Sequence, residues 1–371
     1  MRGGDHHALR QTPIEHAVTY GIPLYGWLRW FAKSAAPCCT LASTTALARN
    51  EPDHSIAALA PSPPQNLLQS AVCLLLLPPL PRTGEGLGEG SAPPVVCCGM
   101  PNNYLLDTAW HQQRRRLAGL EAWFDPGTIR HLEHLGVGPG WRCLEVGAGG
   151  GSIATWLCQR VGPTGSVLAT DLDTRFLDPL IQPNLTVQRH DLLAGPLPAA
   201  AFDLAHARFV IEHLADRSTA LARLAAALKP GGWLLIEDTD SASWLPAPEA
   251  AAAAAALFTR WTDAYVRVCR AAGTDPYAGR RLHGELRALG LSQVGAEGRV
   301  FMVQGGSPTA EVWRLTAEQV SPSIIADGLL SADDMARTLA LLADPTFAWM
   351  EGLVMAAWGQ RPSPPAQNIT V

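Results

Sequence analysis

The sequence predicts an α/β fold in which helices cover both faces of a mostly parallel sheet. Short apolar runs of strand length alternate with segments of helical length between residues 142 and 236. The first of these strands, Arg142–Val146, runs directly into a glycine-rich turn, and turns such as Pro230-Gly231-Gly232 separate later elements. This alternation is typical of parallel sheets, because the connection between parallel strands is usually a helix.

The strands and helices follow from this alternation. An amphipathic helix is expected from Asn103, with a break at Asp125-Pro126 and a second short helix to Leu135. The expected strands are Arg142–Val146, Val167–Asp171, Leu185–His190, Phe202–Val210, Trp233–Ile236, Gln293–Val303 and Leu353–Trp358. The expected helices are Ser152–Arg160, Thr174–Ile181, Ser218–Leu228, Glu249–Cys269, Leu282–Leu289 and Ala310–Leu342, the last broken near Gly328.

The composition divides the 371 residues into unequal parts. Residues 1–99 hold 12 of the 30 prolines and 5 of the 8 cysteines and show no sustained period, which predicts a poorly ordered extension. Helical patterning begins at Met100, and an alternative is that the native protein starts there. Residues 100–140 are expected to form N-terminal helices and residues 141–371 the main domain, with helical insertions at about 241–278 and 308–345.

Charge and cysteine usage restrict the partners. The net charge of −5 argues against nucleic acid as the main partner, so Arg114, Arg115 and Arg116 are interpreted as a solvated helix face. No apolar run reaches the ~18–20 residues of a membrane-spanning helix. Cys143, Cys158 and Cys269 are isolated and no metal-ligand spacing appears, which predicts no metal site and a reducing, cytoplasmic compartment. The sequence does not indicate an oligomeric state.

The glycine-rich turn is the most informative segment. It reads Leu144-Glu145-Val146-Gly147-Ala148-Gly149-Gly150-Gly151-Ser152, between a strand and a helix. A nicotinamide-dinucleotide fingerprint needs glycines at relative positions 1, 3 and 6, but the sixth position here is Ser152. The carboxylate of Glu145 would repel a pyrophosphate and suits an amino-acid ammonium group.

Two acids end the next strands. Asp171 closes the second strand and is able to accept hydrogen bonds from both hydroxyls of a ribose. Asp191 follows the third strand and is able to accept a hydrogen bond from the exocyclic amine of adenine. The alternative for Asp191 is that it only caps the turn that follows.

Together these motifs resemble those of class I S-adenosylmethionine-dependent methyltransferases, and most closely the small-molecule branch of the ubiquinone/menaquinone-biosynthesis type. The motifs are LEVGAGGG, LATDLD, HDLL and the pair FDLAHARFVIEHL and LKPGGWLLIED. The resemblance implies a Rossmann-like seven-stranded sheet with an antiparallel last strand, and helical lid insertions. It implies S-adenosylmethionine as the cofactor, and these cofactor-binding residues: Glu145, Gly147, Ala148, Gly149 and Gly151 for methionine, Asp171 with Leu172 for ribose, Asp191 and Leu192 for adenine, and Arg208 near methionine or substrate.

The expected reaction is methyl transfer by in-line displacement to a small, lipophilic or aromatic acceptor. The candidates for a general base are His213, Glu212 and His206. His213 alternatively orders its loop by hydrogen bonding, and His206 is expected to be a packed core histidine. Trp261, Tyr265 and Trp313 lie in or beside the insertions and are candidate acceptor contacts, with core packing as the alternative. Two other functions stay open: a nicotinamide-dependent oxidoreductase, and a non-catalytic protein that binds S-adenosylmethionine for regulation.

Overall fold

The computed structural model describes residues 105, 106 and 108–363, so the expectations for residues 1–99 lie outside the described part of the chain. A seven-stranded sheet forms the centre of the described fold, with the strand order β3-β2-β1-β4-β5-β10-β7. The last strand, β10, is antiparallel to both of its neighbours, β5 and β7, and the other strand pairs are parallel, as the resemblance implied. The strands are β1 (Arg142–Val146), β2 (Ser166–Asp171), β3 (Leu185–Arg189), β4 (Phe202–Arg208), β5 (Leu228–Asp240), β7 (Ser292–Arg299) and β10 (Leu353–Gln360).

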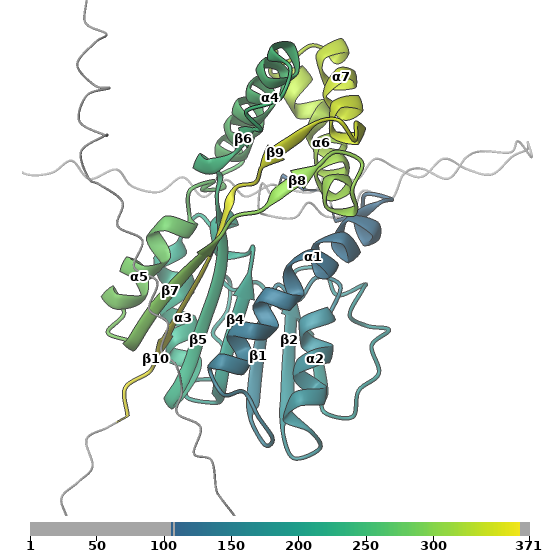
Figure 1. The fold of residues 1–371 in the computed structure, drawn as a ribbon. Helices are drawn as coiled ribbons and strands as arrows, with labels where there is room; N and C mark the ends of the chain where they lie inside the picture. The colour runs from purple at the N-terminus through teal and green to yellow at the C-terminus, as the bar shows by residue number, and fades with distance from the viewer. Residues whose placement is uncertain (1–104, 107, 364–371) are drawn as a thin grey trace, which may run out of the picture. The chain divides into compact units, whose positions relative to one another are not determined.

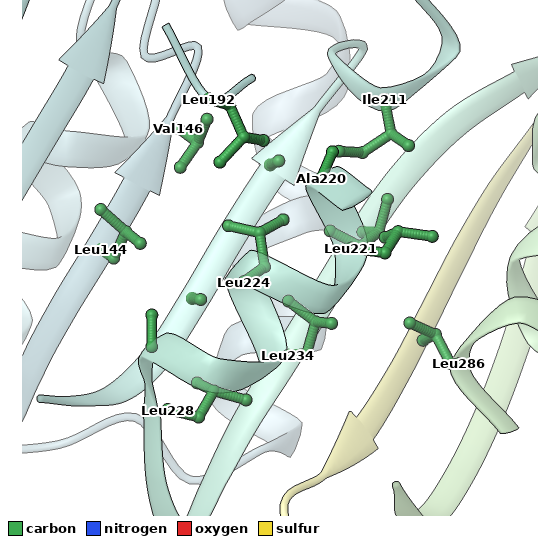
Figure 2. Close-up of a cluster of buried hydrophobic side chains, with 14 of the residues drawn as sticks. Leu144, Val146, Leu192, Ile211, Ala220, Leu221, Leu224, Leu228, Leu234 and Leu286 are labelled. Atoms are coloured by element: carbon green, nitrogen blue, oxygen red, sulfur yellow. The ribbon is translucent and has the colours of Figure 1, made fainter. Parts of the chain in front are cut away.

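Helices cover both faces of this sheet, which confirms the predicted fold class (Figure 1). On one face, α1 (Gln113–His134) and α2 (Ser152–Val161) pack through Leu132 and Leu157, both of which are fully buried. On the other face, α3 (Arg217–Ala227) and α5 (Leu282–Ala288) pack against the strands. Figure 2 shows this second cluster, with Leu221 and Leu224 of α3 near Leu234 of β5, and Leu286 of α5 beside β10.

The structure corrects the expected helix over residues 174–181. This segment forms only turns, in which the amides of Leu177 and Asp178 both donate to the carbonyl of Thr174. Pro179 follows at once and has no amide hydrogen, so it cannot continue a helical ladder, and it disfavours helical torsions at Asp178.

The expected break at Asp125-Pro126 is also wrong. The helix α1 continues through Pro126 to His134. Phe124 and Thr128, on either side of the proline, are both buried. Their packing offsets the loss of the one backbone hydrogen bond that the proline removes. The rule that a proline ends a helix does not consider such packing.

A third cluster of buried side chains forms the lid, which we define as residues 241–278 and 302–350. Its helices are α4 (Ala252–Ala271), α6 (Pro308–Ala326) and α7 (Ala332–Ala343). They pack with a small antiparallel sheet of β6 (Leu245–Pro246), β9 (Ala348–Met350) and β8 (Met302–Gln304), which the sequence did not predict. Within the described residues, no helix has the length and apolarity that a membrane crossing requires.

Candidate active site

A cavity of about 580 Å³ lies where the carboxyl ends of β1, β2, β4 and β5 meet the lid and the first half of α1. Most of the residues that the sequence predicted for a site line this cavity. They are Glu145, Gly147, Ala148, Gly149, Asp171, Leu172, Asp191, Leu192, Arg208, His213, Tyr265 and Trp313. Gly151 and Trp261 are not among the lining residues.

The glycine turn between β1 and α2 requires glycine for steric reasons. Gly147 and Gly149 have φ angles of +67° and +56°, a region that side chains strongly disfavour. A Cβ atom on Gly147 would also lie 2.2 Å from Cγ2 of Val210. Gly151 has φ +87° at the start of α2, where a Cβ atom would lie 2.3 Å from Cδ1 of Leu180. Gly151 is therefore required for the conformation of the turn, although it does not line the cavity.

Asp171 holds this turn against the end of β2. Its Oδ2 accepts a hydrogen bond from the amide of Gly149 at 2.9 Å, and its Oδ1 accepts one from the amide of Asp173 at 3.0 Å. Burial raises the pKa of the Asp171 carboxyl, and the hydrogen bonds oppose this effect. A carboxylate has about four acceptor positions, so these contacts leave acceptor capacity for a ligand.

Asp191 lies at the cavity after β3 and is held in a similar way. Its Oδ1 accepts a hydrogen bond from the amide of Leu193 at 2.8 Å. This contact is the turn-capping role that sequence reasoning left open for Asp191. It engages one acceptor position, so it does not conflict with a second role toward a ligand.

Glu145 also belongs to a buried charged network beneath the cavity. His206 of β4 contacts Glu145 Oε2 through Nδ1 at 2.7 Å and Glu237 Oε2 through Nε2 at 3.3 Å. Burial favours neutral imidazole, but the two carboxylates outweigh it and raise the pKa of His206 to about 9. Burial favours neutral Glu237 too, yet His206 and the groups around it lower its pKa to about 2. His206 is thus a core histidine, as expected, and it is charged.

Arg208 lines the cavity, but its guanidinium is already engaged. Nη2 forms an ion pair with Asp125 at 2.8 Å, and Nη1 donates to Oγ1 of Thr128 at 2.8 Å. Thr128 in turn donates to Glu237 at 2.5 Å. These contacts tie Arg208 to α1, so the structure gives it a positioning role between β4 and the helix.

His213 lies at the cavity in the short 3-10 helix Ile211–His213 that follows β4. Its Nδ1 is 3.1 Å from Oγ1 of Thr274, and its Nε2 is 3.5 Å from Oε1 of Glu212. Burial and the nearby charge of Arg116 lower the pKa of His213, against the opposite influence of Glu212. The neutral form, which can accept a proton, therefore predominates near neutral pH.

Aromatic side chains form the lid wall of the cavity. Trp244, Tyr265 and Trp313 line it, and the rings of Trp244 and Trp313 meet edge to face with centroids 4.5 Å apart. Trp261 lies behind them, 1% exposed, with Phe258 as a neighbour in the lid core. For Trp261 the core-packing alternative therefore describes the structure better than acceptor contact.

Sequence reasoning missed two buried ionisable groups of the cavity wall. Arg116 is 5% exposed and lines the cavity, which corrects its interpretation as part of a solvated face. Glu351 follows β9, is buried, and accepts a hydrogen bond from Nε1 of Trp244 at 2.7 Å. Burial raises the pKa of Glu351 to about 7, although indole N–H donors partly oppose the rise. Helical spacing alone did not reveal which of three consecutive arginines faces inward.

The described residues contain no group of histidine, cysteine and acidic side chains placed to hold a metal ion. The cysteines Cys143, Cys158 and Cys269 are free and buried. Burial raises the pKa of the Cys143 thiol above its usual range. These thiols are therefore core residues and not nucleophiles.

Comparison with known proteins agrees with the motifs and the fold. Residues 105–294, about half of the chain, match the family Methyltransf_23, described as a methyltransferase domain. The chain belongs to this family of class I S-adenosylmethionine-dependent methyltransferases. S-adenosylmethionine is the methyl donor of that class.

Individual relatives cover only parts of the chain. Methyltransferase str2 of Strobilurus tenacellus is 36% identical over 160 residues, which are 42% of this chain and 55% of str2. The ubiquinone/menaquinone biosynthesis C-methyltransferase UbiE of Laribacter hongkongensis is 34% identical over 31% of this chain and 49% of its own length. The chain thus spans about half the length of these relatives.

Among solved structures, phosphoethanolamine N-methyltransferase 2 of Haemonchus contortus is 15% identical to this chain. That structure contains phosphomonomethylethanolamine and S-adenosylhomocysteine, and the match covers 68% of this chain and 58% of that one, with a TM-score of 0.43.

Proposed function

We propose that the protein transfers a methyl group from S-adenosylmethionine to a small, lipophilic or aromatic acceptor. One observation carries this proposal. A glycine turn with Glu145, the acid that ends β2 and the acid that follows β3 all line one cavity, and the aromatic lid residues line the same cavity. The first group suits the cofactor, and the second suits an acceptor with an apolar body.

The residues present fit the cofactor. The turn carries no Cβ atoms at Gly147 and Gly149, so a ligand can approach its backbone closely. Asp171 lines the cavity and retains acceptor capacity, which suits the hydroxyls of a ribose. Leu192 is buried beside Asp191 and offers an apolar contact for the adenine ring.

When bound, S-adenosylmethionine supplies a methyl group that its positive sulfur has already activated. The protein then needs to orient the acceptor and exclude water. Tyr265, Trp244 and Trp313 provide an apolar wall for this purpose. For a hydroxyl or an acidic carbon as the nucleophile, neutral His213 is the candidate group to take the proton.

The family assignment favours this function over a nicotinamide-dependent oxidoreductase. The experiment that separates these functions has two stages. Calorimetry with S-adenosylhomocysteine and with NAD identifies the cofactor, and we expect only the first to bind. Transfer of an isotopically labelled methyl group to a panel of phenols, amines and acidic-carbon compounds then separates an enzyme from a regulatory binding protein. Binding without transfer to any acceptor would contradict the proposed activity.

A further inference from the structure

Arg116 is a buried cation in the cavity wall. It lies in the first turn of α1, and its Nε donates to Oε1 of Gln113 at 3.1 Å. Its two predecessors in the sequence are far more exposed and have acidic partners. Arg115 forms an ion pair with Glu311 at 3.0 Å and Arg114 forms one with Glu121 at 3.3 Å.

Among the residues that the structure describes, no carboxylate forms an ion pair with Arg116. Three other arginines with little exposure do have such partners, in the pairs Arg208–Asp125, Arg217–Glu285 and Arg299–Glu237. A guanidinium is a cation with only hydrogen-bond donors, so burying one without an acidic partner has an energetic cost. A ligand that brings a negative charge into the cavity would remove this cost.

The side chain of Arg116 is close to residues of the acceptor part of the cavity. The charge of Arg116 lowers the pKa of His213 and opposes the burial-driven rise in the pKa of Tyr265. Both residues line the part of the cavity that we assign to the acceptor. The next residue, Leu117, lies near the glycine turn, since a Cβ atom on Gly149 would be 3.5 Å from Cδ2 of Leu117. Arg116 therefore stands between the two parts of the cavity.

We propose that Arg116 binds a carboxylate of a ligand in this cavity. The planar guanidinium can pair with both oxygens of a carboxylate, which makes the contact directional as well as attractive. This inference rests on the proposed function, because two ligands of a methyltransferase could bring the carboxylate. One is the methionine portion of the cofactor, and the other is a carboxylic-acid acceptor.

The first arm of the test addresses the cofactor. Arg116→Gln removes the charge, and Arg115→Gln is the matched control at the neighbouring exposed arginine. Calorimetry measures the affinity of both variants for S-adenosylhomocysteine and for 5′-methylthioadenosine, which lacks the carboxylate. If Arg116 holds the methionine carboxylate, Arg116→Gln weakens S-adenosylhomocysteine binding at least tenfold and leaves 5′-methylthioadenosine binding unchanged. The control changes neither affinity.

The second arm addresses the acceptor, with benzoate as the probe. Benzoate is titrated into the cofactor-free protein and into its S-adenosylhomocysteine complex, and tryptophan fluorescence reports binding. If Arg116 holds an acceptor carboxylate, Arg116→Gln weakens benzoate binding at least tenfold and keeps the S-adenosylhomocysteine affinity of the wild type. Arg116→Lys keeps the charge but not the planar guanidinium. Its benzoate affinity should lie between those of the wild type and Arg116→Gln, and this variant replaces Arg116→Gln if the latter does not fold.

The proposal is overturned if neither arm responds to Arg116→Gln. It is also overturned if the variant only loses thermal stability, because an acid of this chain would then be the partner of the guanidinium. Failure of S-adenosylhomocysteine to bind the wild type would instead contradict the proposed function, and the benzoate titration of the cofactor-free protein would still test Arg116.

Discussion

At the residue scale, the carboxylate of Asp171 holds the glycine turn in place, and we propose that it also accepts hydrogen bonds from a ribose. Replacing it with alanine removes the two expected ribose hydrogen bonds and the support of Gly149. We expect S-adenosylhomocysteine binding to weaken by roughly 1–3 kcal/mol, measured by calorimetry. Asp178→Asn, at an exposed acid outside the cavity, is the control. Unchanged affinity in Asp171→Ala would remove Asp171 from the cofactor site.

His206 predicts a pH dependence of stability. Its pKa in the folded protein is about 9, above the 6.5 of an unperturbed histidine. The folded state therefore holds this proton more tightly than the unfolded state does. The resulting stability is fully present below pH 6.5 and is lost as the pH rises through 9.

Chemical denaturation at several pH values measures this effect. The free energy of unfolding should fall by something on the order of 3 kcal/mol between pH 6.5 and 9.5, and His206→Gln should remove most of that slope. The exposed His134 supplies the control variant His134→Gln, which should keep the slope. An equal slope in the wild type and in His206→Gln would show that His206 is not charged in the fold.

Single residues also mark where sequence reasoning succeeds and where it fails. The positions of Asp171 and Asp191 at the cavity were predictable, because strand ends and glycine turns have local signatures. The burial of Arg116 was not, because three consecutive arginines on a helix point in three directions and only tertiary packing selects the one that faces inward. Glu351 was missed for a similar reason, since its indole partner Trp244 is distant in the sequence.

At the scale of elements, two tryptophans of the lid have different roles. Trp261 is fully buried in the lid core, whereas Trp313 lines the cavity. We expect Trp261→Ala to lower the free energy of unfolding by about 3–5 kcal/mol, the usual cost of such a truncation in a core. Trp313→Ala should impair methyl transfer more than it impairs stability or cofactor affinity.

Thermal melts, calorimetry and turnover measured on both variants check this difference. Phe347→Ala, a truncation in the lid core away from the cavity lining, is the control for a stability loss without a change in turnover. If Trp313→Ala changed only the melting temperature, the lid would have no part in binding the acceptor.

The elements show why patterns predicted most of the fold and not all of it. Alternating strands and helices predicted the sheet correctly, because this pattern is typical of a sheet whose two faces are both covered by helices. Proline had opposite outcomes at two sites. At Pro179 a helix was expected and the proline prevents it, whereas at Pro126 a break was expected and the packing of Phe124 and Thr128 sustains the helix. The small sheet β6-β9-β8 was missed because strands of two or three residues have no detectable period.

At the scale of the whole molecule, the unusual composition of residues 1–99 predicts that they are dispensable. A chain that begins at Met100 should be soluble and should bind S-adenosylhomocysteine with the affinity of the full chain, because every residue that we assign to the cofactor, and Arg116 as well, follows Met100. Calorimetry on the two chains is the measurement. A tenfold weaker affinity in the shorter chain would show that the first 99 residues contribute to the site.

We expect the cavity at the carboxyl ends of the strands to hold S-adenosylmethionine. A crystal structure of the protein with S-adenosylhomocysteine tests this expectation most directly. We predict the ribose hydroxyls within hydrogen-bond distance of Asp171, the adenine beside Asp191 and Leu192, and the sulfur directed toward Tyr265 and Trp313. A cofactor bound outside this cavity, or bound with its ribose away from Asp171, would contradict the account.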